Sequence, residues 1–389
     1  MSYTLKLPPV TYAGKGSLSM LGKLVADEKA KEVLLCTDQG VRRTGLLEQV
    51  EQTLRQNPDL RIQILDTLVP EPSYQAVEEN LRAICRTPDL IIALGGGSVM
   101  DAAKLFSVLY GAEYTIRDLL ENPDLAKKRI KTVMLPTTCG TGAEATCNAI
   151  VAIPEKSVKM GIVSDQMIPD VVILEPEMVR RLPKSVVAAT GVDALAHVVE
   201  CYTSNKATAF SDLYAAAGAK LIFRNLITAY EEPDNMEAKE AMMLGAYYGG
   251  ISITASGTTA VHALSYPLGG KYHIAHGVSN AILFAPVMRV NREACQERLA
   301  ALCDEVFPER QSRIQAEKAE AMIEEISRIV EKTHIPTDLA AFGVPSEDLD
   351  FLVEAGSQQK RLLNNNRKVL SLEDIRGIYQ AVFRGEGDQ

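Results

Sequence analysis

The sequence predicts an α/β domain followed by an all-helical domain, and two features of the chain indicate this arrangement. In the first half, short apolar runs alternate with amphipathic stretches, a pattern typical of a mostly parallel sheet flanked by helices. After Pro183 these runs stop, and long Ala-, Leu- and Met-rich stretches follow. We therefore expect one domain over residues 1–183 and a second over 184–389. The 389 residues exceed the ~250–300 at which single cores stop growing.

Five apolar runs are expected to form the buried strands of the sheet. They are EVLLCT (32–37), RIQIL (61–65), LIIAL (90–94), TVML (132–135) and VVIL (171–174). The preceding segment, LKLPPVTYAGKG, is expected to add a strand or a hairpin. In the second half, residues 314–333 and 370–383 are each expected to form a helix, and residues 385–389 a frayed tail.

The composition excludes several classes of function. A chain that is 47% hydrophobic and 23% charged is typical of a soluble globular protein. Its net charge of −9 argues against nucleic acid or an anionic membrane surface as a partner. No apolar run approaches the ~20 residues of a membrane span, and the amino terminus lacks the apolar core of a signal peptide. Seven cysteines without a CxxC pair favour reduced thiols, so we expect a cytoplasmic protein.

A glycine turn follows the third of these strands, in LIIALGGGSVMDAAK (90–104). Because glycine has no Cβ, Gly96 and Gly97 allow backbone amides to approach a phosphate closely. The helix expected to begin near Ser98 adds the partial positive charge of its amino terminus. The turn therefore suits a pyrophosphate, and the alternative is a tight turn that binds nothing. It is not the GxGxxG fingerprint, so an ordinary Rossmann assignment does not follow.

A second turn of similar character follows the next strand, in LPTTCGTGAEAT (135–146). We expect another helix after it. Thr137, Thr138 and Thr141 can donate to phosphate or ribose oxygens, while their alternative role is helix capping and turn formation. Two such turns at neighbouring strand ends would line one crevice, where open α/β sheets usually bind ligands.

Asp38 follows the strand EVLLCT. A carboxylate at such a strand end can accept hydrogen bonds from an adenosine ribose and repels a 2′-phosphate, which favours NAD over NADP. The alternative is a solvated loop aspartate.

One carboxylate and three imidazoles are the most informative residues of the second half. Asp193 and His197 lie four residues apart in a proline-free stretch that reads as helix, which places them on one face. His262 and His276 follow in AVHALSYPLGGKYHIAHG. Such a set can hold one divalent metal, with Zn²⁺ or Fe²⁺ suited to it. Glu200 is expected to orient one of the imidazoles through its other ring nitrogen, and the alternative is an ordinary helix carboxylate.

The segment HALSYPLGG is expected to begin as a helix and to break at Pro267 and the pair Gly269–Gly270. His276 would then lie beyond the break, at the start of a new apolar helix.

Taken together, these motifs resemble those of the iron-containing (group III) alcohol dehydrogenases over essentially the whole chain. The matching segments are GGGSVMDAAK, TTCGTGAEAT, ATGVDALAHVVECYTS and HALSYPLGGKYHIAHGVSNAILF. The resemblance implies a dinucleotide-binding amino-terminal domain, a helical metal-binding carboxy-terminal domain and an active site in the cleft between them, a fold shared with dehydroquinate synthases. It also implies NAD as cofactor, Fe²⁺ (or Zn²⁺) as metal, and a homodimer or larger homo-oligomer.

Carried over onto this chain, the resemblance implies four metal ligands, namely Asp193, His197, His262 and His276. The cofactor-binding residues that it implies are Asp38, Gly96, Gly97, Ser98, Asp101, Thr137, Thr138, Thr141, Asn148 and Lys159. Two positions depart from the usual pattern. Tyr266 stands where many members carry a histidine, in HALAHP, and Cys139 replaces a residue that is commonly serine or alanine.

The implied reaction is hydride transfer between nicotinamide and a small primary alcohol or its aldehyde, with the metal as Lewis acid. For the accompanying proton, His273 is the nearest titratable candidate and Tyr266 the second, although a phenol with a reference pKa of ~10 is a poor base. A metal-bound water or the ribose hydroxyls are the alternatives.

Three other functions stay open at this point. The substrate can instead be a hydroxy acid or another anionic aldehyde. A dehydroquinate synthase-like lyase would need a basic pocket, which the sequence does not show clearly. A metal-stabilised binding protein without turnover is the third.

Overall fold

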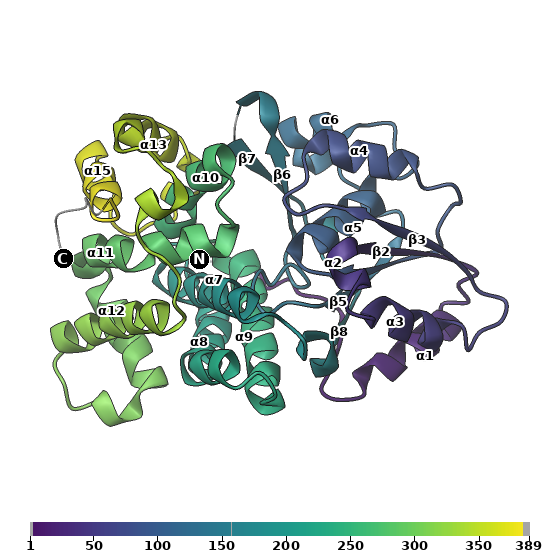
Figure 1. Ribbon diagram of the computed structural model, residues 1–389, viewed down its shortest axis with the longest axis horizontal. Coiled ribbons are helices and arrows are strands. Elements are labelled where there is room, and N and C mark those ends of the chain that lie inside the picture. Colours follow the sequence, from purple (N-terminus) through teal and green to yellow (C-terminus); the bar gives the residue numbers. More distant parts are fainter. Residues whose placement is uncertain (1–2, 157, 384–389) are drawn as a thin grey trace. The chain divides into compact units, whose positions relative to one another are not determined.

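The computed structural model describes residues 3–156 and 158–383, and the chain forms two compact units (Figure 1). One is Lys6–Leu182, and the other is Pro183–Gln389 together with Met1–Leu5. The amino-terminal residues join the helical unit because the ring of Tyr3 packs edge-on against Phe210, with ring centroids 5.4 Å apart. The tail expected at 385–389 lies outside the described residues.

The first unit is built on a six-stranded sheet with the order β1-β8-β5-β4-β2-β3, and every neighbouring pair is parallel. Its strands are β1 (Val10–Ala13), β2 (Glu32–Asp38), β3 (Arg61–Leu68), β4 (Leu90–Gly95), β5 (Lys131–Pro136) and β8 (Val171–Leu174). All the predicted strands are therefore present, and the segment before them contributes a single strand, β1.

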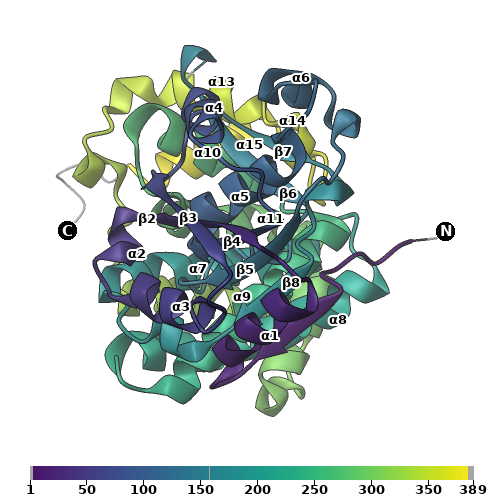
Figure 2. The same ribbon diagram turned by 90° about the vertical axis from the view of Figure 1, so that its right-hand side faces the viewer.

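Helices cover both faces of this sheet, as Figure 2 shows. Side chains of α1 (Met20–Asp27) and α3 (Leu46–Leu54) pack on one face, and those of α4 (Tyr74–Arg82), α5 (Gly97–Leu109) and α6 (Ile116–Glu121) pack on the other. The central strand β4 alternates between the two, since Ile91 faces α5 and Ile92 faces α3. Each such side chain contributes about 1.5–3 kcal/mol through its burial.

The strand order creates a switch point between β2 and β4. Leaving out the edge strand β1, the order follows the doubly wound 2-1-3-4-5 pattern, in which ligands bind where the chain leaves the first and third strands of the series. The strands β2 and β4 end there at Asp38 and Gly95, and the Thr37 hydroxyl donates to the Leu94 carbonyl across them at 2.8 Å.

The prediction of a helix after the second turn is wrong. The segment after β5 continues through turns, with Gly142 at φ 61°, into an antiparallel pair, β6 (Asn148–Ile153) and β7 (Val158–Val163). The threonines and glycines of this turn favour local bends over helix, and the alternating burial of NAIVAI suits a ribbon packed on one side.

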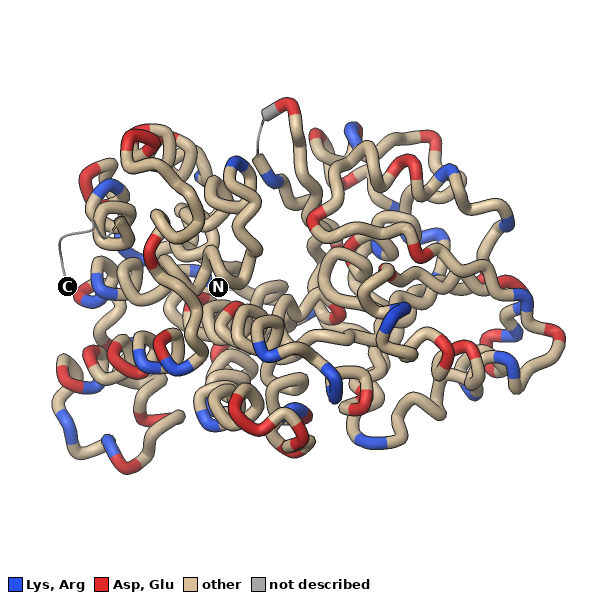
Figure 3. The backbone as a smooth tube through the Cα atoms, viewed as in Figure 1, with Lys and Arg blue, Asp and Glu red and all other residues tan. Residues whose placement is uncertain are grey.

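Within the described residues the second unit contains helices and no strand. The α-helices are α7 (Lys184–Thr203), α8 (Ala209–Glu231), α9 (Met236–Ser256), α10 (Ala260–Tyr272), α11 (His276–Val306), α12 (Gln315–Lys332), α13 (Leu349–Ser357), α14 (Lys360–Leu363) and α15 (Leu372–Gln380). The helices expected at 314–333 and 370–383 are α12 and α15. Figure 3 shows acidic and basic residues interspersed along the solvated α12. None of the described helices combines the length and apolarity that crossing a bilayer requires.

The predicted break at Pro267 and Gly269–Gly270 is also wrong, because α10 continues through all three residues to Tyr272. A proline inside a helix costs about 3 kcal/mol through its lost N–H and ring clash. Residues 260–269 of α10 are buried throughout, so packing offsets this cost. The helix ends one residue later, where His273 takes the left-handed conformation with φ 55°.

Candidate metal centre and cofactor turns

Four side chains from three helices of the second unit converge on one point. Asp193 and His197 extend from the same face of α7, one turn apart, while His262 lies in the first turn of α10 and His276 begins α11. The Nε2 atoms of His197, His262 and His276 lie 3.8, 3.6 and 3.7 Å from the same oxygen of Asp193. One ligand atom from each residue lies within 4.8 Å of all the others.

These separations approach those of a metal centre. Ligand bonds of ~2.1 Å in a tetrahedral site place neighbouring ligand atoms about 3.4 Å apart, so each imidazole nitrogen lies within a few tenths of an ångström of that separation from the Asp193 oxygen. Asp193, His197 and His262 have side chains at most 6% exposed, whereas that of His276 is 30% exposed. Solvent therefore reaches the centre past His276.

The contacts of the Asn280 side chain indicate that this centre requires a positive charge. Its amide nitrogen lies 2.7 Å from Asp193 Oδ1, 3.1 Å from His262 Nε2 and 3.3 Å from His276 Nε2. An NH₂ group has only two protons, so three acceptors surround a position that calls for positive charge. The Asn280 oxygen is buried without a hydrogen-bond partner among the described residues. The ligand atoms thus present lone pairs to a common centre, as a cation would require.

Glu200 holds His262 from the opposite side, as the sequence predicts. One of its oxygens contacts Nδ1 of His262, which leaves Nε2 for the centre. The other oxygen accepts hydrogen bonds from the Thr259 amide at 3.0 Å, the Thr259 hydroxyl at 2.6 Å and the Val261 amide at 2.8 Å. Such a fixed carboxylate sets the tautomer and the ring orientation of a ligating histidine.

The electrostatics of the centre favour charged carboxylates. Burial alone would raise the pKa of Asp193, but the adjacent imidazoles, His197 foremost, hold it far below its usual range. The pKa of Glu200 is likewise lowered, because the charge and hydrogen bond of His262 outweigh burial. For His262 burial works toward a lower pKa, yet the two carboxylates raise it to about 9. A proton or a cation is therefore bound strongly at this place.

The two residues considered for proton transfer differ in position. Tyr266 is buried on α10, one turn beyond His262, and its ring centroid lies 6.1 Å from that of His276. His273 is exposed at the end of α10 and does not belong to the converging set.

In the sheet unit, the two predicted turns lie directly against each other. The strands β4 and β5 end side by side, with Gly95 opposite Pro136 and the Thr137 amide donating to the Gly95 carbonyl at 3.0 Å. A Cβ added to Gly97 would lie 2.7 Å from the Thr141 methyl, and one added to Gly96 would lie 3.4 Å from the Thr138 methyl. Glycine is required at position 97, because a side chain there would collide with Thr141. The two turns lie side by side at the ends of β4 and β5.

The other predicted cofactor residues lie in four elements of the same unit, β2, α5, β6 and β7. Asp38 caps the short helix α2 (Gln39–Arg42) by accepting from the Val41 amide at 2.9 Å. Asn148 and Lys159 belong to the β6–β7 ribbon. Asp101 is buried, and its oxygens bind the Ile150 amide at 3.0 Å and the ammonium of the buried Lys104 at 3.2 Å. It therefore ties α5 to β6.

Two residues near these sites escaped the sequence analysis. Glu71, with φ 51°, donates its amide to the Ser98 hydroxyl at 2.9 Å and pairs with the nearly buried ammonium of Lys159 at 2.6 Å. Nothing local in the sequence marks it, because its partners lie far along the chain. Asn280 is the other, and its spacing of four from His276 on one helix is a signal that was available.

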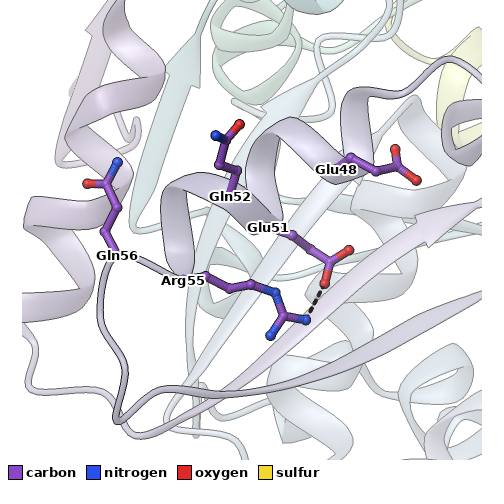
Figure 4. A pocket seen from close by; sticks show the side chains of 5 residues that line it. All are labelled: Glu48, Glu51, Gln52, Arg55 and Gln56. Carbon is purple, nitrogen blue, oxygen red and sulfur yellow. Dashed lines mark hydrogen bonds and ion pairs between the residues drawn. The ribbon is translucent and has the colours of Figure 1, made fainter.

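A surface hollow elsewhere carries no comparable chemistry. Figure 4 shows it lined by one side of α3 and the two residues after it, with an ion pair of 2.8 Å between Arg55 and Glu51. Its remaining lining residues are Glu48, Gln52 and Gln56.

The doubly wound sheet with its glycine turn and the helical unit with its acid–histidine centre define the class as a two-unit, metal-binding dehydrogenase fold. Residues 8–176 match the family described as iron-containing alcohol dehydrogenase, and residues 187–383 match the carboxy-terminal part of the Fe-containing alcohol dehydrogenase family. The chain belongs to the iron-containing alcohol dehydrogenase family, and it is an oxidoreductase.

Individual relatives support this assignment over the full length. The long-chain-alcohol dehydrogenase 1 of Geobacillus thermodenitrificans is 37% identical over 97% of this chain and 96% of its own length. The NAD-dependent methanol dehydrogenase of Bacillus methanolicus is 30% identical over 96% and 97%. A crystal structure of 1,3-propanediol oxidoreductase superposes with a TM-score of 0.91 at 29% identity, covering 98% of this chain and all (100%) of that one.

Proposed function

We propose that this protein interconverts a small primary alcohol and its aldehyde by hydride transfer to or from NAD(H), with a divalent metal at the four-residue centre. The convergence of Asp193, His197, His262 and His276 on one point carries this proposal. We propose Fe²⁺ as the resident ion and Zn²⁺ as the alternative, since one carboxylate and three imidazoles suit both.

In the proposed mechanism, Asp193, His197, His262 and His276 would hold a divalent cation, which would supply Lewis-acid polarisation of the alcohol or aldehyde oxygen. The protein fixes one ligand beforehand, because Glu200 sets the tautomer of His262 and leaves its Nε2 atom for the centre. The exposure of His276 leaves one side of the centre accessible to substrate. Tyr266 is proposed to position the substrate oxygen or to donate a hydrogen bond to it, and His273 to exchange the proton with solvent.

For the cofactor we propose binding at the two turns of the sheet unit. Gly96, Gly97 and Ser98 would receive the pyrophosphate at the amino terminus of α5. Thr137, Thr138 and Thr141 would donate to its oxygens, and Asn148 and Lys159 would reach it from the ribbon. Asp38 would accept from the adenosine ribose, which favours NAD(H) over NADP(H). Asp101 would act indirectly, by fixing β6 beside the glycine turn.

The alternatives have less support. The two relatives reported above are named as alcohol dehydrogenases. We further propose a cytoplasmic homo-oligomer. The cytoplasm agrees with the absence of a disulfide among the described cysteines.

Metal removal and reconstitution test the proposal. Protein treated with a chelator and reloaded with Fe²⁺ or Zn²⁺ is expected to oxidise NADH with butanal, followed at 340 nm, whereas the metal-free protein is not. His262→Ala is expected to lose both metal and activity. His334→Ala, which changes a histidine outside the converging set, is the matched control and should retain both. Phosphate release from a sugar-acid phosphate without net NADH oxidation would instead support a lyase, and failure in every assay would support a binding protein.

A further inference from the structure

A short stretch between α14 and α15 contacts α7, α11 and the entry to α10, the helices that carry the converging ligands. It consists of Asn364, Asn365, Asn366 and Arg367, and we call it the asparagine segment. Asn365 and Asn366 are each only 4% exposed, although amide side chains ordinarily lie at the surface. Buried polar groups are normally hydrogen-bonded, so the partners of these amides identify what the segment holds.

At the entry to α10, Asn365 holds the backbone that leads to His262. Its side-chain amide donates to the Thr258 carbonyl at 2.9 Å. The next residue, Thr259, donates both its amide and its hydroxyl to Glu200, the carboxylate that orients His262. The start of α10 is therefore fixed from two sides, by Asn365 at a carbonyl and by Glu200 at the hydrogen-bond donors that follow it.

At the carboxyl end of α7, the same segment binds the backbone beyond His197. The guanidinium of Arg367 donates to the Thr203 carbonyl at 3.0 Å, and the Asn205 amide donates to the Asn365 carbonyl at 2.8 Å. A basic side chain on the last carbonyls of a helix binds groups without an intrahelical partner and interacts favourably with the helix dipole. This contact lies about 9 Å along α7 from His197, at 1.5 Å per residue.

On α11 the segment forms a reciprocal pair of amides. Asn366 and Asn291 each donate an N–H to the side-chain oxygen of the other, at 2.8 and 2.9 Å, and both are buried. Removing one side chain would leave the donor and the acceptor of the other buried without these bonds, so the pair is sensitive to substitution. Through Asn291 the segment is tied to the helix that begins at His276.

We propose that the asparagine segment positions the four metal ligands, by holding α7, α10 and α11 in the one arrangement that brings their side chains together. The inference rests on the proposed function, because it assumes a divalent ion at the four-residue centre. Metal–ligand distances tolerate changes of only ~0.2 Å, whereas packed helices can shift by about 1–2 Å. The segment acts through the helices, so its members are positioning residues that set the affinity for the ion and its coordination geometry.

Two measurements test the inference: the Kd for Zn²⁺, which reports the strength of the site, and the visible absorption of bound Co²⁺, which reports its coordination geometry. Asn365→Ala removes the bond to Thr258 and is expected to raise the Kd roughly tenfold, the lower end of the loss typical for residues that support metal ligands. It should also change the Co²⁺ spectrum. Arg367→Ala, at an exposed position, should act in the same direction and serves if Asn365→Ala does not fold. Arg367→Lys keeps a charged donor and should recover part of the loss.

Asn235→Ala is the matched control. Asn235 caps α9, a helix outside the converging set, by accepting from the Ala238 amide at 3.0 Å. Loss of this cap should lower the melting temperature and leave the Kd for Zn²⁺ and the Co²⁺ spectrum unchanged. If Asn365→Ala and Arg367→Ala bind Zn²⁺ as tightly as the wild type, or if Asn235→Ala loses as much affinity, the segment serves stability alone; the inference is then overturned while the proposed function stands. A wild-type protein that binds neither ion would overturn both.

Discussion

Gly277 determines how closely α11 approaches α7, and its replacement by alanine should disturb the metal centre from outside. It follows His276 directly, and its α-carbon faces the backbone of α7 at Ala189. An added Cβ would lie 2.7 Å from the Ala189 carbonyl carbon and closer still to its oxygen. Carbon atoms in contact prefer about 3.5–4.0 Å, so the start of α11 must move by about 1 Å.

The expected cost follows from that displacement. Overpacking against backbone, which cannot rotate away, typically costs about 1–3 kcal/mol. For a unit of this size we expect the melting temperature to fall by roughly 3–9 °C. His276 moves with Gly277, and metal bonds tolerate only ~0.2 Å, so we also expect at least a roughly tenfold loss of Zn²⁺ affinity. Thermal unfolding followed by circular dichroism, and Zn²⁺ titration by calorimetry, measure the two effects.

The control is Gly377→Ala in α15, where nothing lies within 4 Å of an added Cβ. Alanine should stabilise that helix by about 0.4–1 kcal/mol and leave metal affinity unchanged. Unaltered melting and Zn²⁺ affinity in Gly277→Ala would refute the close approach of α11 and α7 described here.

Three further predictions concern carboxylates, of which Glu200 and Glu144 are buried and Glu71 is partly exposed. Glu200→Gln should weaken Zn²⁺ binding by about 10- to 100-fold through the loss of the His262 contact, measured by competition with a chelator; unchanged affinity would leave Glu200 a packing residue. Burial raises the pKa of Glu144 from 4.5 to about 7. Between these pH values the folded state retains a proton that the unfolded state releases. The free energy of unfolding therefore falls as pH rises through this range, by about 3 kcal/mol in all. Glu144→Gln should remove this slope in unfolding measured from pH 4.5 to 8, and a parallel pH profile in both proteins contradicts the assignment. Glu71→Gln should release Lys159 for an anionic cofactor and lower the Kd for NADH severalfold in a fluorescence titration, whereas weaker binding would mean that the pair Glu71–Lys159 itself holds the cofactor.

Local patterns sufficed for the strands, for the helix with Asp193 and His197, and for the glycine turn. In each case the apolar periodicity or the backbone requirement lies within a few neighbouring residues. The convergence of His262 and His276 on Asp193 depends on helix packing, and here the family resemblance supplied what spacing alone does not.

The errors have the same origin. Pro267 is a strong local signal for a helix break, but the burial of α10 outweighs it. The second turn resembles the first in composition, yet the alternation in NAIVAI sends the chain into a ribbon instead of a helix. Glu71 became visible only through a partner distant in sequence, Lys159.

The four converging residues all belong to the helical unit, and this has a thermodynamic consequence. The binding free energy of a cation enters only the unfolding equilibrium of the unit that supplies its ligands, about 2.7 kcal/mol at a concentration one hundred times its Kd. Calorimetric scans at rising metal concentration should therefore move the transition of the helical unit upward and leave that of the sheet unit where it is.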